Sequence, residues 1–237
     1  GSRVARWSRG LGDVYKSHGQ VWGGLRLQVA LRRFIARGGG FIGIGQPTAS
    51  VGTQGNADRG GICRGSIFAL SDVLGVDQEI SWSLSKDHYE EPVSEHFITA
   101  DLDGDYIFGE DPGDVVVTDS ATRVLVMDRG SVRASAHDFC AGRSVYLAGL
   151  TWSTVNSRLL HRAIMWAAHA EDQWESVLSS SNPDVEVAWY PESALAFVYN
   201  DADAPRSSEI SGQGGQILVE LAAGQGRWVD WEKGQLL

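Results

Sequence analysis

The sequence predicts a layered α/β domain followed by a small all-β domain. Residues 25–46 combine helically spaced apolar residues with a short apolar strand, which is half of an α/β unit. Strand and helix patterns then alternate to about residue 178, as in α/β architectures. After the linker-like residues 179–183, strand patterns alone remain. We therefore expect an α/β domain at residues 1–178 and a β domain at 183–237, docked on the first because so small a core is marginal.

The helix and strand at residues 25–46 organise the first domain. The glycines at 38–40 end the helix, because glycine adopts left-handed backbone angles at little cost. Residues 41–45 then read as a strand covered on both faces. Ligands of open α/β sheets collect beyond the carboxyl ends of the strands, so the polar loop at 46–64 is the first place to expect a site. The apolar positions of the helix are Leu27, Ala30, Leu31, Phe34 and Ile35.

Local signals set the bounds of the other expected elements. A short helix at 67–74 should end at Gly75, and a helix at 154–169 should begin with Ser153 or Thr154 as its N-cap. Arg129-Gly130 should form a hairpin turn between two strands. The expected strands are 80–84, 115–117, 124–127, 132–136, 143–147, 185–189, 195–199, 216–221 and 227–231.

Composition and net charge exclude several classes of binding partner. The net charge is −10 over 237 residues, so we expect neither a nucleic-acid partner nor an anionic membrane surface. No apolar run approaches the roughly 20 residues of a membrane-spanning helix. Two cysteines far apart do not form a disulfide framework, and no apolar signal segment opens the chain, so we expect a cytoplasmic protein.

The candidate metal ligands lack the spacing of a metal motif. His88, His96, His137 and Asp138 contain no pair at the helical spacing of a zinc site. The acidic stretch at 101–105 does not fit a calcium loop, because the glycine and glutamate that such a loop needs are absent at its sixth and twelfth positions. We therefore expect no metal and no cofactor.

The sequence also shows no recognisable set of catalytic residues. Gln46 follows a buried strand, where some folds place a nucleophile, but glutamine cannot serve as one and no Gly-x-Ser-x-Gly motif is present. Cys63 and Cys140 are isolated, and we expect Cys140 to be a buried, inert thiol. The glycines at 38–45 fit neither the dinucleotide fingerprint nor a phosphate loop. No carboxylate pair for glycosidase chemistry can be selected from the many acidic residues.

Six blocks of sequence, taken in order, resemble one known family. The blocks are residues 34–49 (FIARGGGFIGIGQPTA), 68–77 (FALSDVLGVD), 96–99 (HFIT), 142–150 (GRSVYLAGL), 156–164 (NSRLLHRAI) and 189–193 (WYPES). They resemble the middle and carboxy-terminal domains of the lacto-N-biose (galacto-N-biose) phosphorylases of glycoside hydrolase family 112.

The resemblance implies a fold and a parent activity. The middle domain would resemble a class I glutamine amidotransferase-like (flavodoxin-like) layered fold that lacks its nucleophile. The parent enzyme would convert galactosyl-β-1,3-N-acetylhexosamine and phosphate to α-galactose 1-phosphate and N-acetylhexosamine, and some relatives prefer galactosyl-β-1,4-rhamnose. The general acid and most sugar and phosphate contacts would lie in an N-terminal TIM barrel, which nothing in this chain resembles. The family usually has glutamate where this chain has Gln46.

The leading hypothesis is a non-catalytic middle plus carboxy-terminal portion of such a phosphorylase. It would be inactive alone, act as a structural scaffold in a homo-oligomer, and meet the disaccharide and phosphate through the barrel. Gln46, Asn56, Arg59 and Arg64 are the candidates to reach the barrel's site, and the two arginines suit phosphate because they donate two parallel hydrogen bonds. Two alternatives stay open: a free-standing carbohydrate-binding module with exposed tryptophans, and a sugar-processing enzyme in its own right.

Overall fold

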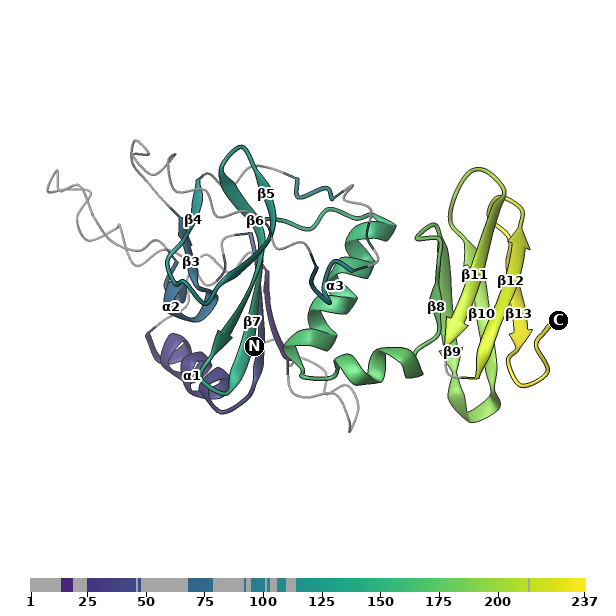
Figure 1. The fold of residues 1–237 in the computed structure, drawn as a ribbon, viewed down its shortest axis with the longest axis horizontal. Helices are drawn as coiled ribbons and strands as arrows, with labels where there is room; N and C mark the ends of the chain where they lie inside the picture. The colour runs from purple at the N-terminus through teal and green to yellow at the C-terminus, as the bar shows by residue number, and fades with distance from the viewer. Residues whose placement is uncertain are drawn as a thin grey trace, which may run out of the picture. The chain divides into compact units, whose positions relative to one another are not determined.

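The computed structural model divides the chain into two compact units, the amino-terminal unit Gly1–Ala170 and the carboxy-terminal unit Glu171–Leu237 (Figure 1). The residues it describes are 14–18, 25–45, 47, 68–78, 92, 95–100, 102, 106–109, 114–212 and 214–237.

A five-stranded mixed sheet is the centre of the amino-terminal unit, in the order β1-β2-β7-β6-β5. β1, β2 and β7 are parallel, whereas β6 and β5 are antiparallel to their neighbours. β3 and β4 form a separate antiparallel pair. The elements are β1 (Val14–His18), α1 (Leu25–Ala36), β2 (Gly40–Ile44), α2 (Ser71–Leu74), β3 (Val76–Gln78), β4 (Val115–Val117), β5 (Arg123–Asp128), β6 (Ser131–Phe139), β7 (Gly142–Leu147) and α3 (Thr154–Ala167).

α1 and β2 form where the sequence predicts a helix followed by a buried strand. Leu31 and Ile35 of α1 are buried, and all five residues of β2 are buried. Gly38 has a φ of 100°, which lets the chain leave the helix. β7 approaches this turn so closely that a Cβ at Gly142 would collide with the carbonyl oxygen of Ile35. The helix is thereby fixed against the sheet.

Two apolar clusters cover opposite faces of the sheet. Phe41 and Tyr146 join α1, α2 and the β3–β4 pair in one cluster. Ile42, Val145 and Leu147 join α3 in the other. Figure 1 shows α1 and α2 on one side of β7 and α3 on the other. Successive residues of a strand point to opposite faces, so β2 and β7 each supply both clusters.

The expectation of a class I glutamine amidotransferase-like, flavodoxin-like layered domain is wrong. Strands outnumber helices in the described chain, and β5, β6 and β7 are joined by tight turns rather than by crossover helices. A flavodoxin-like sheet requires a helical crossover between its parallel strands. The two-residue turns at Arg129-Gly130 and Cys140-Ala141 instead make half of this sheet antiparallel.

Several local expectations are confirmed and one is wrong. Gly75 ends α2 with a φ of 67°, and the Ser153 side chain accepts a hydrogen bond from the Asn156 amide as the N-cap of α3. Arg129 and Gly130 have positive φ values of 51° and 80°, as a type I′ hairpin turn requires. Cys140 was expected to be buried but is exposed, because it occupies the turn between β6 and β7. The strand expected at 80–84 lies outside the described residues.

The carboxy-terminal unit is built from two small antiparallel sheets, β14-β13-β10-β9 and β12-β11-β8. The sequence did not predict β11, because most of its residues are polar. The linker expected at residues 179–183 contains β8, which pairs with β11. The elements are η4 (Glu171–Ser176), β8 (Ser179–Ser180), β9 (Val185–Tyr190), η5 (Pro191–Ser193), β10 (Leu195–Asn200), β11 (Arg206–Gly212), β12 (Gly215–Leu221), β13 (Gly226–Asp230) and β14 (Gln235–Leu236).

One apolar cluster fills this unit. Both sheets contribute buried side chains to it, which identifies the inner face of each sheet. The buried members are Leu178, Val185, Ala196, Val198, Ile210, Val219, Leu221 and Val229. None of the helices in the described part of the chain is long and apolar enough to cross a membrane.

A buried histidine connects α2 to the sheet of the amino-terminal unit. The Thr122 hydroxyl donates to the Gly75 carbonyl at 3.0 Å and lies 3.2 Å from Nδ1 of His137. His137 is 2% exposed. Burial lowers the pKa of His137 below its ordinary value, although Asp119 and Asp138 act in the opposite direction. The folded chain therefore favours the neutral imidazole.

We expect stability to fall with pH through His137. The unfolded chain binds a proton at this residue near pH 6.5, while the folded chain binds it at a lower pH. The free energy of unfolding therefore declines as the pH falls below about 6.5, by at most about 1.4 kcal/mol per pH unit from this group, until the folded state is protonated too. In urea titrations at pH 7.5 and 5.5, His137→Gln should show a smaller decline than the parent chain. An identical decline in both would contradict this assignment.

Candidate functional site

The candidate site lies at the carboxyl edge of the parallel strands β2 and β7. Gly45 leaves β2 with its amide hydrogen-bonded to the Leu147 carbonyl at 2.9 Å, and residues 148–153 connect β7 to α3. This edge is where ligands collect in sheets with parallel strands. The four residues expected to reach a substrate, Gln46, Asn56, Arg59 and Arg64, lie outside the described residues, so the structure does not place them.

A buried asparagine fixes a distant segment to this edge. The Asn156 side-chain amide donates to the carbonyl oxygens of Ile107 at 2.6 Å and Thr151 at 2.8 Å. The Thr151 hydroxyl donates to the same Ile107 carbonyl at 2.6 Å. Asn156 is 1% exposed, so its two bonds are partly shielded from water. Residues 106–109 are therefore tied to the start of α3, and we call this set of bonds the Asn156 clamp.

Close packing supports the clamp. A Cβ at Gly149 would collide with the carbonyl oxygen of Phe108, so a glycine is required where the segment crosses the turn after β7. Phe108 contacts both apolar clusters of the unit. The segment is thus anchored by polar bonds on one side and by apolar packing on the other.

A pocket of about 530 Å³ opens between this segment and the β5–β6 hairpin. Its size lies within the range of small-molecule sites. The described residues that line it are Tyr106, Ile107, Phe108, Gly109, Val126, Met127, Asp128, Arg129 and Arg133.

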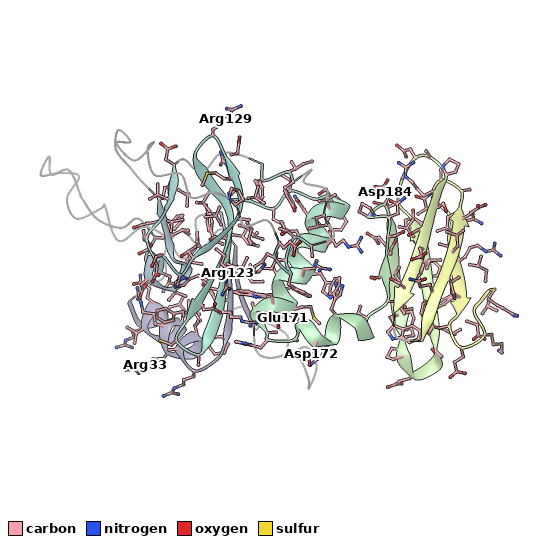
Figure 2. All side chains as sticks on the ribbon, in the orientation of Figure 1. Arg33, Arg123, Arg129, Glu171, Asp172 and Asp184 are labelled. Carbon is pink, nitrogen blue, oxygen red and sulfur yellow. The ribbon has the colours of Figure 1, made fainter. Side chains whose placement is uncertain are left out.

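Three charged residues line the pocket. Nη2 of Arg133 lies 3.6 Å from Oδ2 of Asp128, and the Arg133 side chain is 7% exposed. Arg129 is 89% exposed at the tip of the hairpin, where Figure 2 labels it. Asp128 is the one carboxylate among the described lining residues. Most glycosidases use two opposed carboxyl groups, whereas the described lining offers one carboxylate beside two guanidinium groups that can bind a polar molecule.

Two large apolar side chains are exposed beside the clamp. Trp152 is 80% exposed and Ile107 is 54% exposed. The hydroxyl bond from Thr151 to the Ile107 carbonyl joins the two segments that carry them. We call Ile107 and Trp152 the edge pair. Exposed aromatic and branched aliphatic residues of this kind often mark contact surfaces.

The histidines considered for a metal have other contacts. Nδ1 of His96 accepts a hydrogen bond from the Ile98 amide at 3.2 Å, and its ring lies 5.4 Å from that of Trp166. His137 is buried beside Thr122. Among the described residues, histidine, cysteine and acidic side chains form no group of three that could hold a metal ion. His88 and Cys63 lie outside the described residues.

Sequence reasoning did not find the Asn156 clamp. Asn156 lies 49 residues from Ile107, and no periodicity connects them. The position of Asn156 three residues after the Ser153 cap predicts that its backbone amide bonds to that cap, but not that its side chain reaches Ile107.

Comparison with known proteins supports the family resemblance. The family model described as the lacto-N-biose phosphorylase central domain matches residues 9–172. The model of the C-terminal domain of the same family matches residues 178–229.

Two curated relatives are similar over most of this chain. A 1,3-beta-galactosyl-N-acetylhexosamine phosphorylase of Lachnoclostridium phytofermentans is 36% identical over 221 residues, covering 92% of this chain and 29% of the relative. The phosphorylase of the same name from Bifidobacterium longum is 33% identical over 230 residues, covering 84% of this chain and 29% of the relative. The chain therefore spans less than a third of the length of these relatives.

The structure also resembles a solved β-galactosidase. The match to the enzyme from Bacillus circulans sp. alkalophilus has 17% identity and a TM-score of 0.47, and covers 90% of this chain and 32% of the other.

Removing the Asn156 clamp should loosen residues 106–109. Asn156→Ala leaves the Thr151 carbonyl without this buried donor and should lower the free energy of unfolding by about 2–3 kcal/mol. Hydrogen exchange of the Ile107 amide should accelerate, because its bond to Oδ1 of Asn156 is lost.

The control is Ser153→Ala, which removes the N-cap acceptor alone and should cost about 1 kcal/mol. Its exchange at residues 106–109 should match that of the parent chain. Equal exchange in Asn156→Ala would show that packing, not the clamp, holds the segment.

Proposed function

Because the chain belongs to the lacto-N-biose phosphorylase family, we propose that it is the non-catalytic middle and carboxy-terminal portion of a β-galactoside phosphorylase. The enzyme would convert galactosyl-β-1,3-N-acetylhexosamine and phosphate to α-galactose 1-phosphate and N-acetylhexosamine. In this proposal the chain is a structural and oligomerisation scaffold for a TIM barrel that carries the catalytic residues. The proposed assembly is a cytoplasmic homo-oligomer that needs no cofactor.

The extent of the family match carries this proposal. Both matched domains are named as the central and C-terminal parts of the family. The relatives named for phosphorylase activity are covered over 29% of their length, so most of each relative lies outside the match. A catalytic centre elsewhere in such an enzyme is consistent with this coverage.

The chemistry of the pocket favours a scaffold over an independent sugar-processing enzyme. Its described lining offers a single carboxylate, Asp128, which faces the guanidinium of Arg133 at 3.6 Å. A retaining or inverting glycosidase uses two carboxyl groups, and phosphorolysis needs a general acid aimed at the leaving oxygen. The described lining offers no carboxyl pair, and its one carboxylate is ion-paired with Arg133 rather than free to act as a general acid.

The edge pair supplies a surface for the proposed barrel contact. Trp152 is 80% exposed, and the turn that bears it is fixed by the Thr151 and Asn156 hydrogen bonds. A rigid exposed tryptophan can bury a large area while losing little conformational entropy. We propose that Trp152 and Ile107 pack against the barrel.

Reconstitution with a separately made barrel domain tests the scaffold role. The chain alone should show no phosphate-dependent cleavage of galactosyl-β-1,3-N-acetylglucosamine, whereas the mixture should be active. With the barrel at fixed concentration, Trp152→Ala should raise the chain concentration needed for half-maximal activity about tenfold, because a central aromatic contact is lost.

Leu218→Ala is the matched control, since Leu218 is 65% exposed on β12 of the other unit. It should leave the half-maximal concentration unchanged. Activity of the chain alone would overturn the scaffold role. Equal behaviour of Trp152→Ala and the parent chain would remove the edge pair from the contact.

The polar loop at 46–64 is proposed to reach the barrel's site through Gln46, Asn56, Arg59 and Arg64. In the reconstituted enzyme, Arg59→Gln and Arg64→Gln should each raise the KM for phosphate about tenfold, because a guanidinium bonded to phosphate contributes a charge-assisted pair. Arg33→Gln is the control, because Arg33 is exposed on α1, away from the carboxyl edge (Figure 2). Unchanged kinetics after removal of the whole loop would end this assignment.

A further inference from the structure

The four-stranded sheet of the carboxy-terminal unit has an unusual outer face. Residues directly opposite each other in antiparallel strands point to the same side. Phe197 is opposite both Ala188 and Trp228, and Leu195 is opposite Tyr190. This side faces away from the buried Ala196, Val198 and Val229. An outer sheet face is normally polar, but this one is rich in aromatic residues. We define the aromatic face as Tyr190, Leu195, Phe197, Tyr199 and Trp228.

Trp228 contacts two other rings on this face. Its ring centroid lies 5.1 Å from that of Phe197 and 5.5 Å from that of Tyr190. Phe197 lies against Gly226, where any Cβ would collide with the ring. Trp228 remains 42% exposed and Tyr190 48% exposed. The indole is therefore fixed in orientation yet open to solvent, which lowers the entropy lost on binding.

The charge of the unit limits what can bind there. Residues 171–237 contain 12 aspartates and glutamates but 3 lysines and arginines, a net charge of −9. This is nearly all of the chain's net charge of −10. Anionic lipids, phosphates and nucleic acids are repelled by such a unit, and so is the same face of a second copy. A neutral ligand meets no such penalty.

Hydrogen-bonding groups border the aromatic face. Glu186 is exposed and lies opposite Tyr199 in the sheet. Asp230 lies opposite Leu195 and is paired with Lys233 at 2.7 Å. Carboxylates accept hydrogen bonds from hydroxyl groups, and the tyrosine hydroxyl can donate or accept them. A ligand rich in hydroxyl groups with one apolar surface would match both the rings and this border.

We propose that the aromatic face binds a neutral galactoside, with the sugar ring stacked on Trp228. The axial hydroxyl of galactose leaves the C–H groups at carbons 3, 4 and 5 on one side, and this apolar side suits the indole. Glu186 and Tyr199 would accept or donate hydrogen bonds at the edge of the sugar. The choice of galactose rests on the proposed function, whereas the location of the site rests on the geometry of this unit alone.

Saturation-transfer NMR on the 237-residue chain tests this site with two matched disaccharides. Lactose and cellobiose share a β-1,4 linkage to glucose and differ in the orientation of one hydroxyl group. Lactose should receive saturation at its galactosyl H3, H4 and H5, with a dissociation constant of the order of millimolar, as expected for a shallow site. Cellobiose should bind at least about threefold more weakly. No saturation of lactose at 20-fold excess over the chain would overturn the proposal.

Variants then locate the binding. Trp228→Ala should raise the dissociation constant for lactose at least about tenfold, and Tyr190→Ala should raise it about threefold because it supports the indole. Leu218→Ala changes a more exposed apolar residue, on β12, and should bind as the parent chain does. If Trp228→Ala fails to fold, Trp228→Phe replaces it in the test: this variant keeps an aromatic ring and should retain lactose binding.

The opposing outcomes assign the face differently. Unchanged lactose binding in Tyr190→Ala and Trp228→Ala would overturn the site. If the parent chain does not bind lactose and the Trp228→Ala chain binds the isolated barrel domain more weakly than the parent does, the aromatic face is a protein contact and not a sugar site. Sugar binding is measured without phosphate or barrel, so its failure is separate from a failure of reconstitution.

Discussion

The amino-terminal unit depends on the hydrogen bonds that one carbonyl oxygen, that of Ile107, accepts. The Ile107 carbonyl receives donors from both Thr151 and Asn156, each at 2.6 Å. These bonds bring a segment from before β4 against the turn between β7 and α3. Without them the pocket would lose one wall, and the edge pair would no longer share a fixed surface. The Asn156 side chain is 1% exposed, so an alternative arrangement would leave its buried amide unpaired, and the network therefore rigidifies this part of the chain.

Structural features that depend on a few neighbouring residues could be predicted from the sequence. The apolar spacing of α1, the left-handed cap at Gly75, the Ser153 N-cap and the Arg129-Gly130 turn each depend on residues a few positions apart. The order of strands in the sheet does not. The Arg129-Gly130 hairpin predicts the antiparallel β5–β6 pair, but nothing in the sequence predicted that β7 would pair with both β6 and the parallel strand β2, which makes the sheet mixed.

The candidate site was harder to predict for a related reason. The Asn156 clamp and the pocket join segments from three parts of the chain, and no periodicity marks such contacts. β11 was missed because its serines and glutamate do not give an apolar alternation, although Ser208 and Ile210 are buried. Conversely, the family resemblance was found from sequence because it rests on blocks of residues rather than on contacts.

The sheet of the amino-terminal unit also has a consequence for folding kinetics. β5, β6 and β7 are connected by two-residue turns and can therefore pair rapidly. β2 must then add to β7 across a separation of roughly 100 residues, between Gly40 and Arg143. Closing so long a loop slows the docking of β2 and α1. Until it occurs, one side of β7 is an unpaired edge open to other chains, so a chaperone or prompt completion of the sheet would limit aggregation during synthesis.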